Sequence, residues 1–528
     1  MKLTLPLAVL LTHAATAVLG AFQLTSTSSA YTVDTDGGLV FSVSRTTGDI
    51  LTLVYNSVDY QSKEGKWTHI NSGLGTSTVT AETVGSDYIK ITIVSAANPV
   101  THYYVAKKGD SVIYMGTYIT GEVSPGELRW LARLDKTNLP TSIRDPASDN
   151  TGGVAIEGSD VFLADGTTRC KFYSSDRFID DLVHTVSGPG IYISLVMPGT
   201  AYETSSGGPF MRDINNQETS TSQEFTFYMN SGHLRTEPWR MGLKGPYAAV
   251  FSSTGPASAD LDTSFFSELD ILGYVPQSGR GLMTGSVSGV PSEFEAVIAW
   301  SNTENQYWTR ASSSGSYTSP YMKPGTYTMK LYKQELLVAI QTVTVAVGGS
   351  TTSNIASTEV VAASPVFRIG EFDGQPFEFK NGDKFLGMHP SDTRMSTWGG
   401  NYTVGVSTAA DFPMALFAKT GGPATITFTA ANTAKRTLRI ATTLSFKTGR
   451  PSVVINGAWT GADPGAPVLI DSRGVTRGGY RGYGESYEWE VPAGTLVAGE
   501  NTLVVGVTGS GDAGFLSANY IVDAIELY

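Results

Sequence analysis

The sequence has little of what marks most functional classes. Its 528 residues contain a single cysteine, Cys170, which excludes an internal disulfide framework. Charged residues make up only 16% of the chain, and 36 Lys and Arg stand against 48 Asp and Glu. No basic run occurs, so we expect neither a nucleic acid nor an anionic membrane as a partner.

Familiar catalytic signatures are missing as well. The chain has no G-x-S-x-G elbow, no H-E-x-x-H motif, no Walker A loop and no C-x-x-C pair. No two histidines beyond the N-terminal segment have the i, i+4 spacing of a helical zinc site; they are His69, His102, His184, His233 and His389. A zinc hydrolase is therefore not expected. A glycosidase needs only two carboxylates, and 48 acids leave that class open.

Turn formers and strand formers are what the sequence has in abundance. It contains 58 Gly and 24 Pro, and its 25 Tyr outnumber its 22 Phe. Alternating patterns such as those at 88–94 and 327–332 predict strands. We therefore predict an all-β protein, which excludes a helical bundle, a coiled coil or a doubly wound α/β fold.

The N-terminal segment 1–20 predicts a secretory signal peptide. One lysine precedes an apolar stretch, and small residues precede Ala21. No later apolar run reaches the ~18 residues that a membrane span needs. We expect a secreted, extracellular monomer, and the sequon Asn401-Tyr402-Thr403 predicts a glycan on Asn401.

Turn-rich boundaries divide the rest of the chain into three units. We expect a large β-sandwich at 21–272, a smaller fibronectin type III-like β-sandwich at 273–358, and a carbohydrate-binding-like jelly roll at 359–528. Acidic loops at Asp373 and Asp523 leave room for a structural calcium in the third unit. The sequence does not identify a metal-ligand set.

One stretch of the first unit combines a core pattern with two cations. Read as a strand, 126–134 places four apolar side chains on one face: Leu128, Trp130, Ala132 and Leu134. Arg129 and Arg133 then share the other face, roughly 13 Å apart at ~3.3 Å per residue. In an acidic protein this pair indicates a groove for carboxylates, which arginine binds bidentately. Two solvated surface arginines are the alternative.

Two further stretches hold candidate groups for proton transfer. Lys171 follows Cys170 and precedes an aromatic pair, and His233 follows a glycine in Asn-Ser-Gly-His-Leu-Arg. A lone lysine is more often a solvated charge, and a lone histidine is more often structural. The residue types alone therefore leave both roles open.

Nine motifs, in order along the chain, resemble those of the rhamnogalacturonan endolyases of polysaccharide lyase family 4. They are EGSDVFL, RCKFYSSDRFIDD, SSGGPFMRDIN, YMNSGHLRTE, MGLKGPY, DTSFF, MKPGTYTM, MHPSDTRMSTW and DSRGVTRGGYRGYGE. The similarity extends from Ala21 to Tyr528. It implies a catalytic β-sandwich followed by fibronectin-like and carbohydrate-binding-like domains. The implied substrate is the rhamnogalacturonan I backbone of pectin.

The resemblance also implies a reaction, β-elimination at the rhamnose-(1→4)-galacturonate bond. The product carries an unsaturated galacturonosyl group at its new non-reducing end. Because proton removal beside a carboxylate creates a dianion, such a site needs converging cations. Lys171 resembles the catalytic base of the family and His233 its partner in proton transfer. Arginines take the place of the calcium of many pectate lyases, so no cofactor is required for catalysis.

The same resemblance assigns the substrate groove. Arg129 and Arg133 match arginines that bind galacturonate, and Tyr228 matches a groove tyrosine. Thr226 stands where relatives have an aromatic residue, and Cys170 stands where they have a small one.

The third unit also contributes to the implied cleft. Arg473 and Arg477 match cleft arginines of the family, and we expect Tyr480 to offer its ring to a sugar. The glycine-rich segment that carries them is predicted to be a loop. These contacts require the third unit to fold back onto the first.

Two other functions stay open. A rhamnogalacturonan hydrolase would use carboxylates such as Asp180 and Asp181. A non-catalytic pectin-binding protein would bind the polymer and release no oligosaccharide. Ultraviolet absorbance of an unsaturated product separates a lyase from both.

Overall fold

The computed structural model describes residues 21–528 except 125, 145–146, 234 and 469–472. The predicted signal peptide lies outside these residues. Strands dominate the described chain, which has one short α-helix, α1 (Gly474–Arg477). The all-β prediction is confirmed. Among the described residues no helix is long and apolar enough to cross a membrane.

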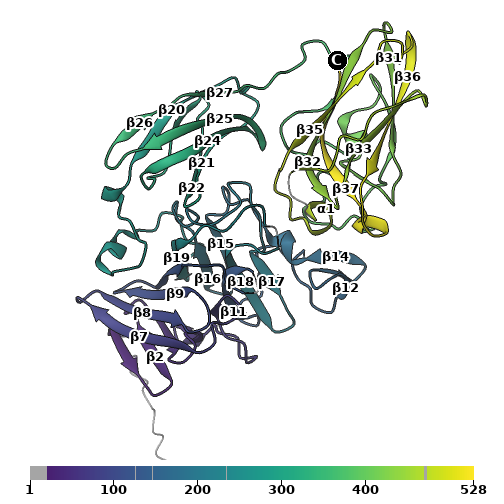
Figure 1. Cartoon of the computed structure of the whole chain (residues 1–528). Coiled ribbons are helices and arrows are strands. Elements are labelled where there is room, and N and C mark those ends of the chain that lie inside the picture. Colours follow the sequence, from purple (N-terminus) through teal and green to yellow (C-terminus); the bar gives the residue numbers. More distant parts are fainter. Residues whose placement is uncertain (1–20, 125, 145–146, 234, 469–472) are drawn as a thin grey trace, which may run out of the picture.

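Three bodies, each with its own core, make up the molecule (Figure 1). Their strands occupy 23–252, 282–356 and 367–527. In Figure 1 the first body lies at the bottom, the second at the upper left and the third at the upper right.

The first body is built on four sheets. A five-stranded sheet contains β1 (Gln23–Ser26), β2 (Ala30–Asp34), β3 (Leu39–Ser44), β4 (Ile50–Tyr55) and β5 (Val58–Asp59). A seven-stranded antiparallel sheet has the order β15 (Val183–Gly188), β16 (Ile191–Val196), β19 (Gly242–Ser252), β10 (Val112–Ile119), β9 (Val100–Lys107), β8 (Tyr88–Ser95) and β7 (Ser77–Val84). The predicted strand at 88–94 is thus β8.

The other two sheets of this body position the site. One has the order β17 (Asn216–Glu218), β18 (Ser222–Asn230), β11 (Leu128–Asp135) and β6 (His69–Ile70). The other is a small sheet of β12 (Val154–Glu157), β13 (Val161–Ala164) and β14 (Thr167–Cys170), which continues into the 3-10 helix η1 (Lys171–Ser174).

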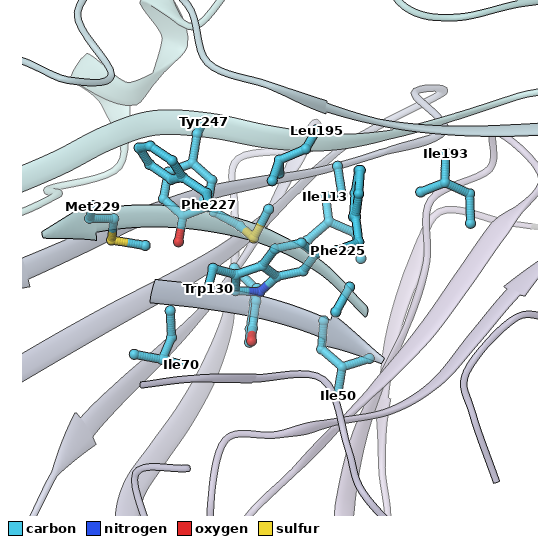
Figure 2. Close-up of a cluster of buried hydrophobic side chains, with 14 of the residues drawn as sticks. Ile50, Ile70, Ile113, Trp130, Ile193, Leu195, Phe225, Phe227, Met229 and Tyr247 are labelled. Carbon is cyan, nitrogen blue, oxygen red and sulfur yellow. The ribbon is translucent and has the colours of Figure 1, made fainter. Parts of the chain in front are cut away.

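The sheet that contains β11 packs face to face against the seven-stranded sheet. Figure 2 shows Trp130 of β11 and Phe225 of β18 beside Ile113 of β10 and Leu195 of β16. Alternate residues of β11 face this core, as predicted: Leu128, Trp130, Ala132 and Leu134 are all buried. The intervening side chains must then face away from it.

The second and third bodies are both two-sheet sandwiches. The second contains β23 (Ser316–Thr318), β20 (Leu282–Ser288), β26 (Ser350–Thr352) and β27 (Ile355–Ala356), packed on β22 (Gln306–Arg310), β21 (Ala296–Ser301), β24 (Gly325–Lys333) and β25 (Leu336–Val345).

The third contains β28 (Phe367–Gly370), β37 (Asn519–Leu527), β32 (Arg436–Phe446), β35 (Glu485–Val491) and β30 (Ala415–Phe417), packed on β29 (Gly400–Thr403), β31 (Ala424–Ala430), β36 (Gly499–Thr508), β33 (Arg450–Ile455) and β34 (Trp459–Thr460). The described chain also has four 3-10 helices besides η1: η2 (Ser264–Glu268), η3 (Gln277–Gly279), η4 (Ala409–Asp411) and η5 (Gly514–Leu516).

A buried carboxylate fixes the second body to the first. Glu203 is only 2% exposed and pairs with Arg280 at 2.7 Å and Lys323 at 3.0 Å. The hydroxyl of Tyr307 also donates to Glu203 at 2.8 Å. A buried charge with this many partners is satisfied, whereas removing any one of them would leave it partly uncompensated.

The third body docks on the small sheet β12–β13–β14. The backbone nitrogen and the hydroxyl of Thr168 both donate to the Asp392 carboxylate, at 2.8 and 2.6 Å. Arg394 pairs with the same carboxylate at 2.7 Å. The third unit therefore folds back onto the first, as the matched arginines required.

Candidate functional site

β11 and β18 form the floor of a polar cleft of about 240 Å³. The structure brings five residues singled out in the sequence into this cleft: Arg129, Arg133, Lys171, Tyr228 and His233. The two arginines reach it because they alternate with the buried residues of β11. Tyr228 lies directly opposite Arg129 on β18.

Each arginine of the floor is held by an acid. Arg129 Nη1 lies 2.8 Å from Glu127 Oε1, and the same guanidinium donates to the Tyr228 hydroxyl. Arg133 pairs with Glu224, its cross-strand neighbour on β18. Both guanidinium groups are largely buried, so their orientation is fixed before any ligand arrives.

Lys171 lies where β14 ends and η1 begins. Its Nζ is 3.7 Å from Asp160 Oδ1, in the turn between β12 and β13. Arg477 of the third body reaches the other oxygen of that carboxylate, with 2.9 Å between Nη1 and Oδ2. One acid therefore contacts both the candidate base and a cation from a different domain.

His233 lies between two carboxylates. Its Nε2 is 3.3 Å from Glu127 Oε2, and its Nδ1 is 3.4 Å from Asp213 Oδ1. Burial alone would lower the pKa of His233, but the charge and hydrogen bond of Asp213 and the charge of Glu127 outweigh it and raise that pKa. The imidazolium therefore persists to higher pH than in a free histidine, which suits a proton donor.

Arg473 and Arg477 converge on one buried carboxylate of the first body. Arg473 Nη1 and Arg477 Nε lie 2.8 and 3.0 Å from Glu157 Oε1, and His389 Nε2 lies 3.5 Å from Oε2. Burial opposes the charge of Glu157, yet the hydrogen bonds from His389, Arg477 and Arg473 lower its pKa to about 2. We call this contact between α1 and β12 the seam.

The prediction that Tyr480 binds substrate is wrong. Its side chain is fully buried in the core of the third body, packed edge-on against Phe385. Its hydroxyl donates to the Gly374 carbonyl. The predicted loop also differs from the structure, because 474–477 forms α1 and Gly478 ends it at φ 65°. After that turn, Tyr480 lies in the core of the third body.

The acids named for a hydrolase lie elsewhere. Asp181 is buried and is bound to His184 at 2.8 Å and to the Tyr202 hydroxyl at 3.2 Å. Asp180 pairs with Arg177 at 2.6 Å and with Arg310 of the second body. Neither carboxylate is among the residues lining the cleft.

Sequence reasoning missed most of the acids and one lysine of the site: Glu127, Glu157, Asp160, Asp213, Glu224 and Lys66. Glu127 could have been found, since it directly precedes the alternating strand that carries Arg129. Glu157 and Asp160 lie inside a motif quoted for the resemblance but carry no local sign of their partners.

The acidic loops of the third body do come together. The carboxylate of Asp523 accepts the backbone nitrogen of Gly374 at 2.7 Å and that of Asp373 at 3.3 Å. Burial, together with the charge of Glu378, raises the pKa of Asp373 to about 7. In the described ranges no group of three or more His, Cys, Asp or Glu is arranged to hold a metal. A structural calcium at these loops stays a prediction.

Family models match three successive parts of the chain. Residues 22–273 match the family model described as rhamnogalacturonan lyase B, N-terminal. Residues 279–353 and 365–527 match the models for polysaccharide lyase family 4, domain II and domain III.

Curated fungal proteins are similar over nearly their full length. Rhamnogalacturonate lyase A of Emericella nidulans is 51% identical over 516 residues, which is 96% of each chain. Rhamnogalacturonate lyase A of Aspergillus aculeatus is 51% identical over 518 residues, again 96% of each chain. A putative rhamnogalacturonase of Neurospora crassa is 49% identical over 523 residues, covering 97% of this chain and 96% of that one.

Proposed function

The chain belongs to polysaccharide lyase family 4, and from this membership and the cleft we propose that it cleaves rhamnogalacturonan I of pectin by β-elimination. The bond cut is the rhamnose-(1→4)-galacturonate linkage. One observation carries the proposal: Lys171 and His233 line the same cleft as Arg129 and Arg133. A base, an acid and two carboxylate-binding cations are the groups that this reaction needs.

Lys171 acts as the base. Its Nζ takes the proton from C5 of the galacturonate, and the electrons of that C–H bond form the C4–C5 double bond. The C4–O4 bond breaks, and O4 departs with the rhamnose. No water is consumed, so the new non-reducing end is an unsaturated galacturonosyl group.

Arg129 and Arg133 stabilise the charge that develops. Proton removal beside a carboxylate gives a dianionic, enolate-like species, and preoriented cations lower its energy without reorganising. Their orientation is fixed by Glu127 and Glu224. Because both guanidinium groups are fixed in the protein itself, the proposal includes no cofactor.

His233 donates the proton that the leaving oxygen needs. Its raised pKa keeps the imidazolium populated to higher pH than in a free histidine, and its two carboxylate neighbours Glu127 and Asp213 orient the ring. Tyr228 lies between this ring and Arg129, with its ring centroid 5.6 Å from that of His233. We assign it to sugar binding.

We also propose where the enzyme acts and in what form. We propose a secreted monomer that carries a glycan on Asn401, which is exposed on β29. The name of the relatives, rhamnogalacturonate lyase, supports an enzyme that acts on pectin, and the signal peptide predicted at 1–20 supports its secretion.

Incubation with de-esterified rhamnogalacturonan I tests the function. A lyase gives oligosaccharides that absorb in the ultraviolet and are lighter by one water than hydrolysis products. Saturated products would instead indicate a hydrolase, and binding without products would indicate a non-catalytic pectin-binding protein. Polygalacturonate is the control substrate, and its efficient cleavage would contradict the rhamnogalacturonan assignment.

A further inference from the structure

Two hollows lie end to end along β11. The cleft of about 240 Å³ is followed by a second hollow of about 290 Å³. The same two segments contribute to each: Lys66, Gln217 and Thr219 line the cleft, and residues 62–64 and 220–221 line the second hollow. In the paired strands β11 and β18, Arg129 lies opposite Tyr228, and Asp135, the last residue of β11, lies opposite Ser222. Asp135 lines the second hollow, which therefore lies at the C-terminal end of β11. The floor from Arg129 to Asp135 is about 20 Å long at ~3.4 Å per residue.

The cations on these walls already have acidic partners, with one exception. Lys171 pairs with Asp160, and the two arginines of the floor pair with Glu127 and Glu224. In the second hollow, Lys63 pairs with Asp59 and Lys136 with Glu218, the latter at 2.8 Å.

Lys66 is the exception. It is exposed, it lines the cleft on the side of the second hollow, and within the described part of the chain it makes no ion pair. It lies near the floor, because it lines the cleft together with Leu131, whose neighbour on β6 is His69. Burial, then the charges of Arg133, Arg129 and Lys66, lower the pKa of His69 to about 4.

We propose that Lys66 binds a second carboxylate of an acidic polysaccharide, at a subsite beyond the reacting sugar in the direction of the second hollow. The inference rests on the proposed function, in which every second sugar of the substrate is a uronate. While the reacting carboxylate lies against Arg129, the next uronate along the strand direction comes to Lys66. Lys63 and Lys136 would first have to leave their own acids.

The test uses Lys66→Ala, the charge-preserving Lys66→Arg, and Lys108→Ala as a matched control. Lys108 is exposed in the turn between β9 and β10 and, in the described chain, also makes no ion pair, but it lines neither hollow. Rhamnogalacturonan oligosaccharides of two lengths are assayed, one that ends at the reacting uronate and one that carries the next uronate in the direction of the second hollow. KM is measured at low and at high salt.

For the longer substrate, Lys66→Ala should raise KM about 3- to 5-fold at low salt, as expected for an exposed charge pair. The effect should shrink at high salt and be smaller for the short substrate. Lys66→Arg should stay within about twofold of the wild type, because a single exposed carboxylate accepts either cation. Lys108→Ala should leave KM unchanged.

Equal KM values for Lys66→Ala and Lys108→Ala on both substrates would overturn the proposal while the lyase function stands. If the wild type gave no unsaturated product, the lyase function would fail instead. Titration calorimetry of the same oligosaccharides then decides on Lys66. A length-dependent loss of affinity in Lys66→Ala supports the subsite, and equal affinities reject it.

Discussion

Two pairs of arginines in this molecule have the same spacing and opposite uses. Arg129 and Arg133 lie on a strand, where residues four apart share a face but stand ~13 Å from each other. Arg473 and Arg477 flank and end a helical turn, where residues four apart are neighbours. The first pair therefore spreads along the cleft, each with its own acid, whereas the second converges on Glu157.

This difference in geometry places the two arginine pairs in different surroundings. The strand pair faces an open cleft and can bind carboxylates at two points. The helix pair faces protein and joins the third body to the first. Only the Nη1 atom of Arg477 extends past Glu157, to Asp160 beside Lys171. The seam therefore contacts the proposed base through Asp160.

The largest expected effect is at Lys171, where the two regions meet. Lys171→Ala should lower kcat by ~10²–10⁴, the usual contribution of a general base. Thermal unfolding should hardly change, since the Nζ–Asp160 distance of 3.7 Å is long for an ion pair. Lys171→Arg is the control, because it keeps the charge yet cannot act as a neutral base. A variant of either kind with more than about a tenth of wild-type activity would exclude Lys171 as the base.

The seam should dominate stability. Glu157→Gln keeps the shape but removes the charge that both arginines share, and a pKa lowered from 4.5 to about 2 corresponds to about 3 kcal/mol. We expect faster hydrogen exchange at 154–157 and 474–477 and a lower unfolding temperature. Glu490→Gln, which breaks the exposed pair with Lys435, should change stability by less than about 0.5 kcal/mol. Similar results for both variants would mean that the seam does not hold the domains.

Acid should erase the difference between the wild type and Glu157→Gln. Because the folded state lowers the pKa of Glu157, its stabilisation is fully present above about pH 4.5 and is lost as the pH falls through about 2. The unfolding temperatures of the two proteins should converge over that window. A difference that stays constant down to pH 2 would exclude the charge of Glu157 as its cause.

Lysine exchange distinguishes the two arginine pairs in activity. Arg129→Lys should lower kcat/KM about 10- to 100-fold, since it removes a charge-assisted hydrogen bond in a fixed geometry. The matched Arg473→Lys should change kcat/KM only a few-fold, because Arg473 contacts Glu157 and lies outside the residues lining the cleft. Steady-state kinetics on one oligosaccharide measures both. Equal losses would show that both pairs bind substrate directly.

The smallest effect concerns pH. Glu127→Gln removes one charge that raises the pKa of His233, so the imidazolium should be lost at lower pH and the alkaline limb of kcat should move down. Loss of the Glu127–Arg129 ion pair should lower kcat at every pH, and beyond that loss activity on the alkaline side should fall about two- to threefold further. Glu122→Gln, at the surface pair with Arg235, should leave the limb in place. An unmoved limb in Glu127→Gln would argue against His233 as the acid.

The sequence was most predictive where a local period decides the structure. Alternation in 128–134 predicted both the core face of β11 and the placement of the two arginines on the opposite face, because successive side chains of a strand point to opposite sides. Lys171 and His233 could be singled out only by resemblance, and their roles stay predictions. Neighbouring residues mark neither of them chemically.

Elsewhere, contacts could not be predicted from the sequence, because the partners lie far apart along the chain or because a single turn changes where a side chain lies. Glu157 and Arg477 are 320 residues apart, and no local pattern can pair them. Tyr480 was misjudged because it follows two arginines, although Gly478 turns the chain after α1 and buries the tyrosine. A glycine in the left-handed region is a usual helix end, so α1 itself could have been anticipated.

The buried cysteine is a natural chemical probe of how often the structure opens around it. Cys170 is the only thiol in the chain, and its Sγ lies 3.6 Å from the Arg477 carbonyl, directly under the seam. Burial raises the pKa of the thiol, so it is nearly inert while α1 covers it. An alkylating reagent can reach Cys170 only when the core of the first body opens around it or α1 lifts from β14. The rate of alkylation therefore reports these openings, with no introduced label.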